Sequence, residues 1–209
     1  MKREIFTIPS YAGRDISIKH ITDDNSSLAV YFPGQNYSCE LPLLHYLGKV
    51  GLESNHDLLM LEYGYQSARI DFDPDKIDEI TSESHNAIMN IAGNYKEIVF
   101  ISKSLGTVIA GKVDRLMNDQ WKVSHIFLTP IKSSIPFINK APRGLIIWGT
   151  NDPALNEDDL MQIHFTEERR LHKIIGGNHA LEVGDVYQSL SVISEIVKVG
   201  QNFLMKKNL

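Results

Sequence analysis

The segment of residues 97–116 constrains the fold of this chain more than any other, because a buried strand passes directly into an amphipathic helix within it. It opens with the apolar, strand-forming run 98–101 and continues through S-K-S-L-G, in which Ser104 is central. A serine at such a junction has the layout of a nucleophile elbow, a turn so sharp that only small residues fit two positions before and after it. Ser102 and Gly106 occupy those positions. Because S-x-S-x-G also occurs by chance, the remaining chain must supply a base, an acid and an oxyanion site.

Strands and helices alternate along most of the chain. Apolar runs bounded by turn residues predict eight strands, at residues 4–9, 15–22, 27–32, 57–62, 98–101, 123–129, 144–148 and 171–175. Helical spacing predicts further helices at residues 38–50, 73–91, 156–165 and 183–204, the first of them stopped by Gly51. An antiparallel pair followed by this alternation predicts a three-layer α/β fold, with helices on both faces of a mostly parallel sheet. In such sheets, ligands bind beyond the carboxyl ends of the strands.

Composition narrows the class of protein. The 209 residues are enough for one domain, residues 1–209, with a substantial core. The formal net charge of −5 argues against a nucleic-acid partner. The single cysteine, Cys39, excludes an intrachain disulfide and is typical of the cytoplasm. We expect no signal peptide, because the first residues lack an apolar core, and no membrane partner, because no apolar run approaches the roughly 20 residues of a membrane span.

Two loops that follow predicted strands contain a candidate acid and a candidate base. Asp152 lies in G-T-N-D-P, where a carboxylate can accept the Nδ1–H of a histidine and fix its tautomer, although N-D-P alone is equally typical of a turn or a helix cap. His179 lies in G-G-N-H-A-L-E and is the best candidate for the base, because the other seven histidines fall within predicted elements, at a helix end or at the opposite end of the sheet. No pair of histidines has the spacing of H-E-x-x-H, so we expect neither a metal site nor a cofactor.

The loop after the strand at residues 27–32 reads F-P-G-Q-N-Y and offers an oxyanion site. Gly34 allows a tight backbone turn, which would direct the amide N–H of Gln35 into the crevice. Together with the N–H of Leu105, the residue after the serine, it would form a hole with two donors. The same motif also occurs as an ordinary Pro-Gly turn before a helix.

The chain order Ser104, Asp152, His179, each in a loop after a strand, resembles the α/β-hydrolase superfamily over nearly the whole chain. The sequence is most similar to small, lidless bacterial members of the dienelactone-hydrolase-like kind. This resemblance implies a Ser-Asp-His triad on an eight-stranded sheet whose second strand is antiparallel. Two departures are visible: dienelactone hydrolase has a cysteine nucleophile, so its substrate does not carry over, and the oxyanion loop lacks the His-Gly-Gly of many lipases. Cys39 lies outside the elbow, and we interpret it as a small apolar residue near the start of a helix.

The substrate is less constrained than the chemistry. Residues 130–142 are barely long enough for the crossover between two parallel strands, so no cap domain is expected and the site should be open. The candidates for its wall are Tyr37, Tyr63, Tyr65, Lys103, Ile131 and Glu182. An open site suits a small acyl ester or thioester better than a long lipid, which predicts a carboxylesterase-like serine hydrolase. A non-catalytic protein of this fold that binds a ligand or partner, and an acyltransferase with the same triad, stay open, as does the choice between monomer and homodimer.

Overall fold

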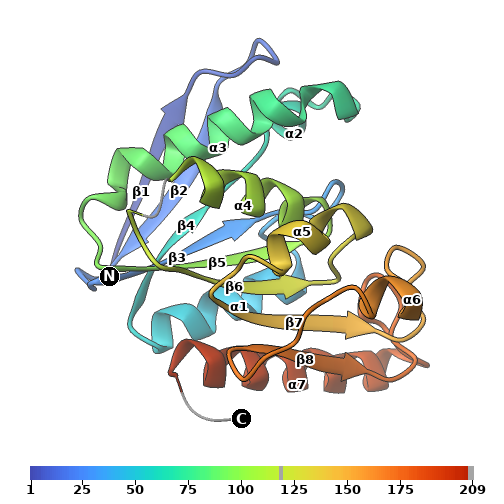
Figure 1. Ribbon diagram of the computed structural model, residues 1–209. Helices are drawn as coiled ribbons and strands as arrows, with labels where there is room; N and C mark the ends of the chain where they lie inside the picture. Colours follow the sequence, from blue (N-terminus) through green and yellow to red (C-terminus); the bar gives the residue numbers. More distant parts are fainter. Residues whose placement is uncertain (118–119, 207–209) are drawn as a thin grey trace.

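The computed structural model describes residues 1–117 and 120–206, and within them the chain forms one eight-stranded sheet (Figure 1). The strand order is β1-β2-β4-β3-β5-β6-β7-β8. The strands are β1 Lys2–Ile8, β2 Ile16–Thr22, β3 Ser27–Phe32, β4 His56–Met60, β5 Glu97–Lys103, β6 Val123–Leu128, β7 Arg143–Gly149 and β8 Arg169–Ile174. Strand β2 is antiparallel to both of its neighbours, whereas β4, β3 and β5 to β8 pair in parallel. The expected three-layer α/β fold is confirmed.

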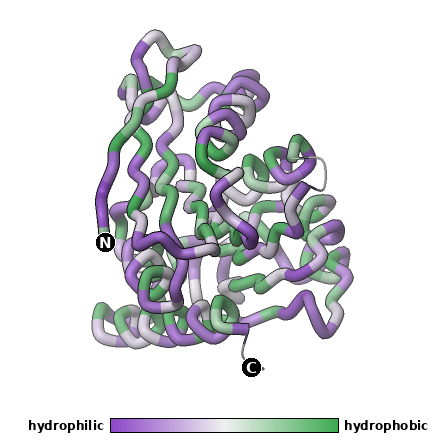
Figure 2. The backbone as a smooth tube through the Cα atoms, turned by 90° about the vertical axis from the view of Figure 1, so that its left-hand side faces the viewer, coloured by the Kyte–Doolittle hydropathy of each residue, from purple (hydrophilic) through white to green (hydrophobic). Residues whose placement is uncertain are grey.

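Helices cover both faces of this sheet. The α-helices are α1 Pro42–Glu53, α2 Gly64–Ala68, α3 Ile77–Ala92, α4 Leu105–Leu116, α5 Ile135–Ile138, α6 Glu157–Leu160 and α7 Val186–Leu204, and short 3₁₀ turns occupy Pro74–Lys76 and Lys132–Ser134. Helices α1 and α7 pack together on one face, and α3 and α4 pack together on the other. In Figure 2 the covering helices alternate between hydrophobic and hydrophilic residues along their turns, as expected of helices with one face on a core.

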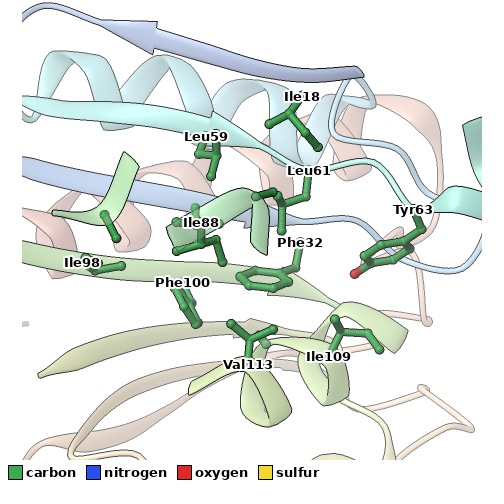
Figure 3. Close-up of a cluster of buried hydrophobic side chains, with 14 of the residues drawn as sticks. Ile18, Phe32, Leu59, Leu61, Tyr63, Ile88, Ile98, Phe100, Ile109 and Val113 are labelled. Carbon is green, nitrogen blue, oxygen red and sulfur yellow. The ribbon is translucent and has the colours of Figure 1, made fainter. Parts of the chain in front are cut away.

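Strand β5 shows why the central strands are continuously apolar. Successive side chains of a strand point to opposite faces of the sheet, and here both faces are covered. Ile98 and Phe100 pack with α3 and α4, next to Ile88 and Val113 (Figure 3). Val99 and the residues in phase with it pack on the opposite face, with α1 and α7. The strand is therefore fixed between two cores, and its carboxyl end is held rigidly.

Helices α1, α3 and α7 begin three or four residues later than predicted, and the predicted end of α1 was also wrong. Helix α1 does not stop at Gly51 but continues to Glu53. A Cβ at Gly51 would lie 2.7 Å from the hydroxyl of Tyr31, so this glycine is required for packing rather than for ending the helix.

The helix predicted at residues 156–165 ends at Leu160 as the short helix α6. Its start was predicted correctly, since the side chain of Asn156 accepts the amide of Asp159 at 2.9 Å. The remainder is not helical because Asn139, from the loop after α5, takes the backbone groups that a helix would use. Its side chain donates to the carbonyl of Gln162 at 2.9 Å and accepts the amide of His164 at 2.8 Å.

The connection between β6 and β7 contains only a 3₁₀ turn and the single-turn helix α5, so no cap domain covers the carboxyl ends of the strands. Within residues 1–117 and 120–206, no helix has the length and apolar character needed to cross a membrane.

Candidate active site

Three loops at the carboxyl ends of β5, β7 and β8 bring Ser104, Asp152 and His179 together. The Nε2 atom of His179 lies 2.8 Å from the Oγ of Ser104. On the other side of the ring, Nδ1 lies 2.8 Å and 2.9 Å from the two carboxylate oxygens of Asp152. With the ring proton on Nδ1, the imidazole donates to the carboxylate and accepts the serine hydroxyl, so the three side chains form one hydrogen-bonded array. The carboxylate is fully buried and the imidazole is 36% exposed.

The turn at Ser104 is strained and closely packed. Its backbone has φ 51° and ψ −118°, a region that non-glycine residues rarely adopt. Two positions later, a Cβ at Gly106 would lie 2.5 Å from the carbonyl oxygen of Pro33 and 2.6 Å from that of Phe32, so only glycine lets α4 approach β3 this closely. Two positions earlier, Ser102 is fully buried and its hydroxyl is directed at the carbonyl of Ile126, 3.3 Å away. Ser102 therefore fits the turn as its small residue.

The loops of the acid and the base touch each other directly. A Cβ on Gly149, at the end of β7, would overlap the backbone carbonyl of Gly177, in the loop after β8. The amide of Asn151 donates to that same carbonyl at 2.9 Å. This contact places the start of the Asp152 loop against the start of the His179 loop, so the carboxylate and the imidazole share one local framework.

Asn178 closes the loop that presents His179. Its side-chain oxygen accepts the amides of Ala180 at 2.8 Å and Glu182 at 3.0 Å, and its own amide donates to the carbonyl of Glu182 at 3.1 Å. Leu181 completes the turn with φ 63°. This role of Asn178 was not predicted from the sequence, although asparagine in a loop is a typical side-chain-to-backbone turn former.

The loop after β3 lies beside Ser104 and turns back on itself. The amide of Gly34 donates to the carbonyl of Tyr37 at 2.8 Å, which leaves Gln35 and Asn36 at the tip of the turn. The amide of Gln35 donates to no protein acceptor in the part of the chain that the structure describes, and the same holds for the amide of Leu105, the first residue of α4. Both groups are free to bind an oxyanion.

Comparison of the sequence with models of known families and with curated proteins gives no match. Solved structures do match. A serine hydrolase without a lid from Xanthomonas campestris is 11% identical, with a TM-score of 0.72 over 95% of this chain and 93% of that chain. Est1E from Butyrivibrio proteoclasticus is 13% identical, with a TM-score of 0.73 over 97% and 98%. The esterase Pf2001 from Pyrococcus furiosus is 12% identical, with a TM-score of 0.74 over 100% and 94%. The chain has the α/β-hydrolase fold.

The hydrogen-bonded array of Ser104, His179 and Asp152 lies beside a cavity of about 600 Å³. Its walls are formed by the loops after β3, β5, β7 and β8, and comprise Gly34, Gln35, Asn36, Tyr37, Lys103, Ser104, Pro153, Asn178, His179 and Ala180. Two of the residues predicted to line the site, Tyr37 and Lys103, are on this wall. Leu105 is buried just beneath it, at the start of α4.

The other four predicted lining residues lie elsewhere. Tyr63 and Tyr65 are buried in the core (Figure 3 shows Tyr63 among its apolar side chains), where their hydroxyls donate to the carbonyls of Pro33 at 3.0 Å and Gln35 at 2.8 Å. They support the loop after β3 from below and are not on the cavity wall. Ile131 is not on the cavity wall, and Glu182 lines a separate hollow beside α7.

Lys103 has an unusual environment for a lysine, because it is only 2% exposed to solvent. Its ammonium donates to the hydroxyl of Thr129 and to the backbone carbonyl of His179, both at 2.8 Å, and lies 4.9 Å from the centre of the Tyr37 ring. Burial lowers the pKa of this ammonium to about 8, while the negative charge of Asp152 opposes the change. The sequence predicted Lys103 at the site but did not point to Thr129 as its partner.

Within the described residues, no group of three or more His, Cys, Asp or Glu side chains has an arrangement that could hold a metal ion. Cys39 is buried, and burial raises the pKa of its thiol. Its sulfur lies 3.4 Å from the carbonyl of Leu61, and Cys39 is not on the cavity wall, which agrees with its interpretation as a small apolar residue.

Proposed function

We propose that this chain is a carboxylesterase-like serine hydrolase, which cleaves an ester or thioester of a small acyl group through a covalent acyl-serine intermediate. The observation that carries the proposal is the continuous hydrogen-bonded array from Asp152 through His179 to Ser104. A serine hydroxyl is a weak nucleophile by itself, and an adjacent imidazole held by a buried carboxylate is the arrangement that activates it.

In the proposed first step, Ser104 Oγ forms a bond to the substrate carbonyl carbon while its proton moves to Nε2 of His179. The electron pair of the carbonyl moves to its oxygen. Asp152 keeps the imidazole oriented and stabilises its positive charge without accepting the proton. When the tetrahedral intermediate collapses, the bond to the leaving alcohol or thiol breaks and the leaving group takes the proton from Nε2. Water then repeats the sequence on the acyl-serine, which releases the acid and restores the hydroxyl.

The amides of Gln35 and Leu105 are the proposed donors to the oxyanion. Their support comes from the free N–H groups on either side of Ser104 and from the position of Leu105 at the N-terminus of α4, where the helix dipole favours negative charge. One donor of an oxyanion hole is typically worth about 10²–10³ in rate. These backbone amides need no reorganisation during the reaction, because α4 fixes Leu105 and the hydrogen bonds from Tyr63 and Tyr65 fix the turn that contains Gln35.

Support for the substrate class comes from the shape of the site. The cavity of about 600 Å³ is open to solvent and has no cap, so it suits a small acyl group or one that protrudes from a larger molecule. The similar structures point the same way: one is described as an esterase, and Est1E was solved with ferulic acid bound. These descriptions apply to those proteins, and here they support ester chemistry in general.

A fluorophosphonate probe tests the proposal, because it phosphonylates only an activated serine. We expect labelling of the wild-type chain, none in Ser104→Ala, and full labelling in the matched control Ser102→Ala, which removes the neighbouring buried hydroxyl. A panel of esters and thioesters of increasing acyl length, run with the same variants, then defines the substrate class. Labelling that persists in Ser104→Ala, or a folded wild-type protein that neither reacts with the probe nor turns over any ester, would rule out the serine hydrolase.

A further inference from the structure

Lys103 is a buried cation at the centre of the site. It makes no ion pair with any carboxylate among the described residues, and its donors are directed to the Thr129 hydroxyl, the His179 carbonyl and the face of the Tyr37 ring. Burying an ammonium is costly unless its hydrogen bonds and charge are compensated. An ammonium with three contacts but no counter-ion contributes little to the stability of the fold. Its charge is therefore expected to have a role in the site.

The contacts of Lys103 join four loops of the site. Lys103 is the last residue of β5, directly before Ser104. Thr129 follows β6, His179 lies in the loop after β8, and Tyr37 lies in the loop after β3. The ammonium of Lys103, the residue directly before Ser104, therefore makes a hydrogen bond to the backbone carbonyl of His179. A displacement of the His179 loop away from Ser104 would break the contact between Nζ and the His179 carbonyl.

We propose that Lys103 is a positioning residue, whose ammonium holds the main chain of His179 against the elbow and whose charge limits protonation of the His179 imidazole. The inference rests on the proposed function, since it assigns a role within the same array. It also revises the sequence-based interpretation of Lys103 as a substrate contact, because all three donor directions of its ammonium are occupied within the protein.

The electrostatic part depends on the groups that face the ammonium. Asp152 contributes a negative charge from the loop after β7, and its field favours the charged lysine. Tyr37 contributes a phenol whose pKa burial raises, so it stays neutral across the working range, and Glu182 acts on that phenol from the loop after β8. Thr129 is uncharged. The ammonium thus offsets the Asp152 carboxylate. Its removal leaves that carboxylate unopposed, which stabilises the imidazolium of His179 and delays its deprotonation to higher pH.

The pKa of Lys103 sets the pH range in which its charge offsets Asp152. Burial places the pKa of the ammonium at about 8, so the charge is present below that pH and disappears above it. The deprotonated amine retains two N–H groups for Thr129 and His179, but it no longer offsets Asp152. The charge is therefore present throughout the pH range in which an ordinary histidine loses its proton, and its removal should act on that rising limb of the rate.

The test is the second-order rate of fluorophosphonate labelling from pH 5 to 10, corrected for probe hydrolysis, in the wild-type chain, Lys103→Met and Thr129→Val. Methionine approximates the length of lysine without charge or donors, whereas Thr129→Val removes one acceptor and keeps the charge. We expect the rising limb of Lys103→Met to move about one pH unit higher, which is roughly 10-fold in rate on that limb. Thr129→Val should keep the rising limb at the wild-type pH.

Different outcomes separate the two proposals. If the wild-type chain is not labelled at any pH, the proposed function fails. If it is labelled but Lys103→Met has the wild-type pH profile, changed only in height, the role of Lys103 is overturned. Should Lys103→Met not fold, as judged by circular dichroism, Lys103→Gln takes its place: a rising limb at the wild-type pH overturns the inference, and a limb moved to higher pH supports it.

Discussion

Gly106→Ala is the substitution that tests the architecture of the elbow most directly. The added Cβ would lie 2.5 Å and 2.6 Å from two backbone carbonyl oxygens, those of Pro33 and Phe32. Since a close C···O contact is roughly 3.3 Å, α4 would have to move by about 0.8 Å relative to β3. Neither neighbour is a flexible side chain that can rotate away. We therefore expect a cost at the upper end of the range for overpacking, about 3 kcal/mol in the free energy of unfolding.

Urea unfolding and thermal melting measure this cost. For a chain of this length, about 3 kcal/mol corresponds to a fall in Tm of about 6–12 °C. The displaced helix also carries the amide of Leu105 away from its place beside Ser104, so the labelling rate should fall by roughly 10²-fold. Gly93→Ala is the matched control, because this position has helical backbone angles and no atom within 4 Å of the added Cβ.

The control should be neutral or gain up to about 1 kcal/mol through a less flexible unfolded chain. If Gly106→Ala unfolds within about 0.5 kcal/mol of the wild type and reacts at the wild-type rate, the close approach of α4 to β3 is not required and the reasoning fails.

Three further substitutions have defined outcomes. Asp152→Asn should keep the fold but lower kcat by about 10⁴-fold, because the amide leaves His179 in the wrong tautomer; the value is that of a serine protease used as a reference, and kcat on a short activated ester checks it. Tyr65→Phe removes the hydrogen bond to the carbonyl of Gln35 and should cost about 1 kcal/mol in urea unfolding, with a lower labelling rate; an unchanged rate would mean that the loop is held without this bond. Asn156→Ala removes the cap of α6 and should cost about 1 kcal/mol with labelling intact, so a loss of labelling would contradict the separation of α6 from the site.

Much of the fold could be predicted because the signals were local. The strand β3 and the apolar core of β5 follow from short runs of strand-forming residues, and the order of strands and helices fixes which ends of the sheet carry loops. The meeting of Ser104, Asp152 and His179 at one edge followed from that order, before any distance was known. The prediction of a helix at residues 156–165 was wrong beyond Leu160 because Asn139, distant in sequence, makes hydrogen bonds with backbone groups that local periodicity assigns to a helix.

The environment of single side chains was the least predictable part. Tyr63 and Tyr65 follow a strand at the correct edge of the sheet, but their position in the chain does not say whether a ring points outward or into the core. Lys103 presents the same difficulty in stronger form, since lysine is rarely buried and composition gives no reason to expect it. Its partner Thr129 is recognisable only after β5 and β6 are aligned in register.

The contact between Gly149 and Gly177 also bears on how this scaffold could be altered. Because the loops of Asp152 and His179 are built against each other, an insertion or a graft in either would disturb both at once. The turn after β3 lies against Ser104 and is held by α2 instead. The side chains of residues 35 and 36 can therefore be varied to reshape the entrance while Asp152 and His179 stay in register, which makes that turn the natural place to redirect selectivity in a library.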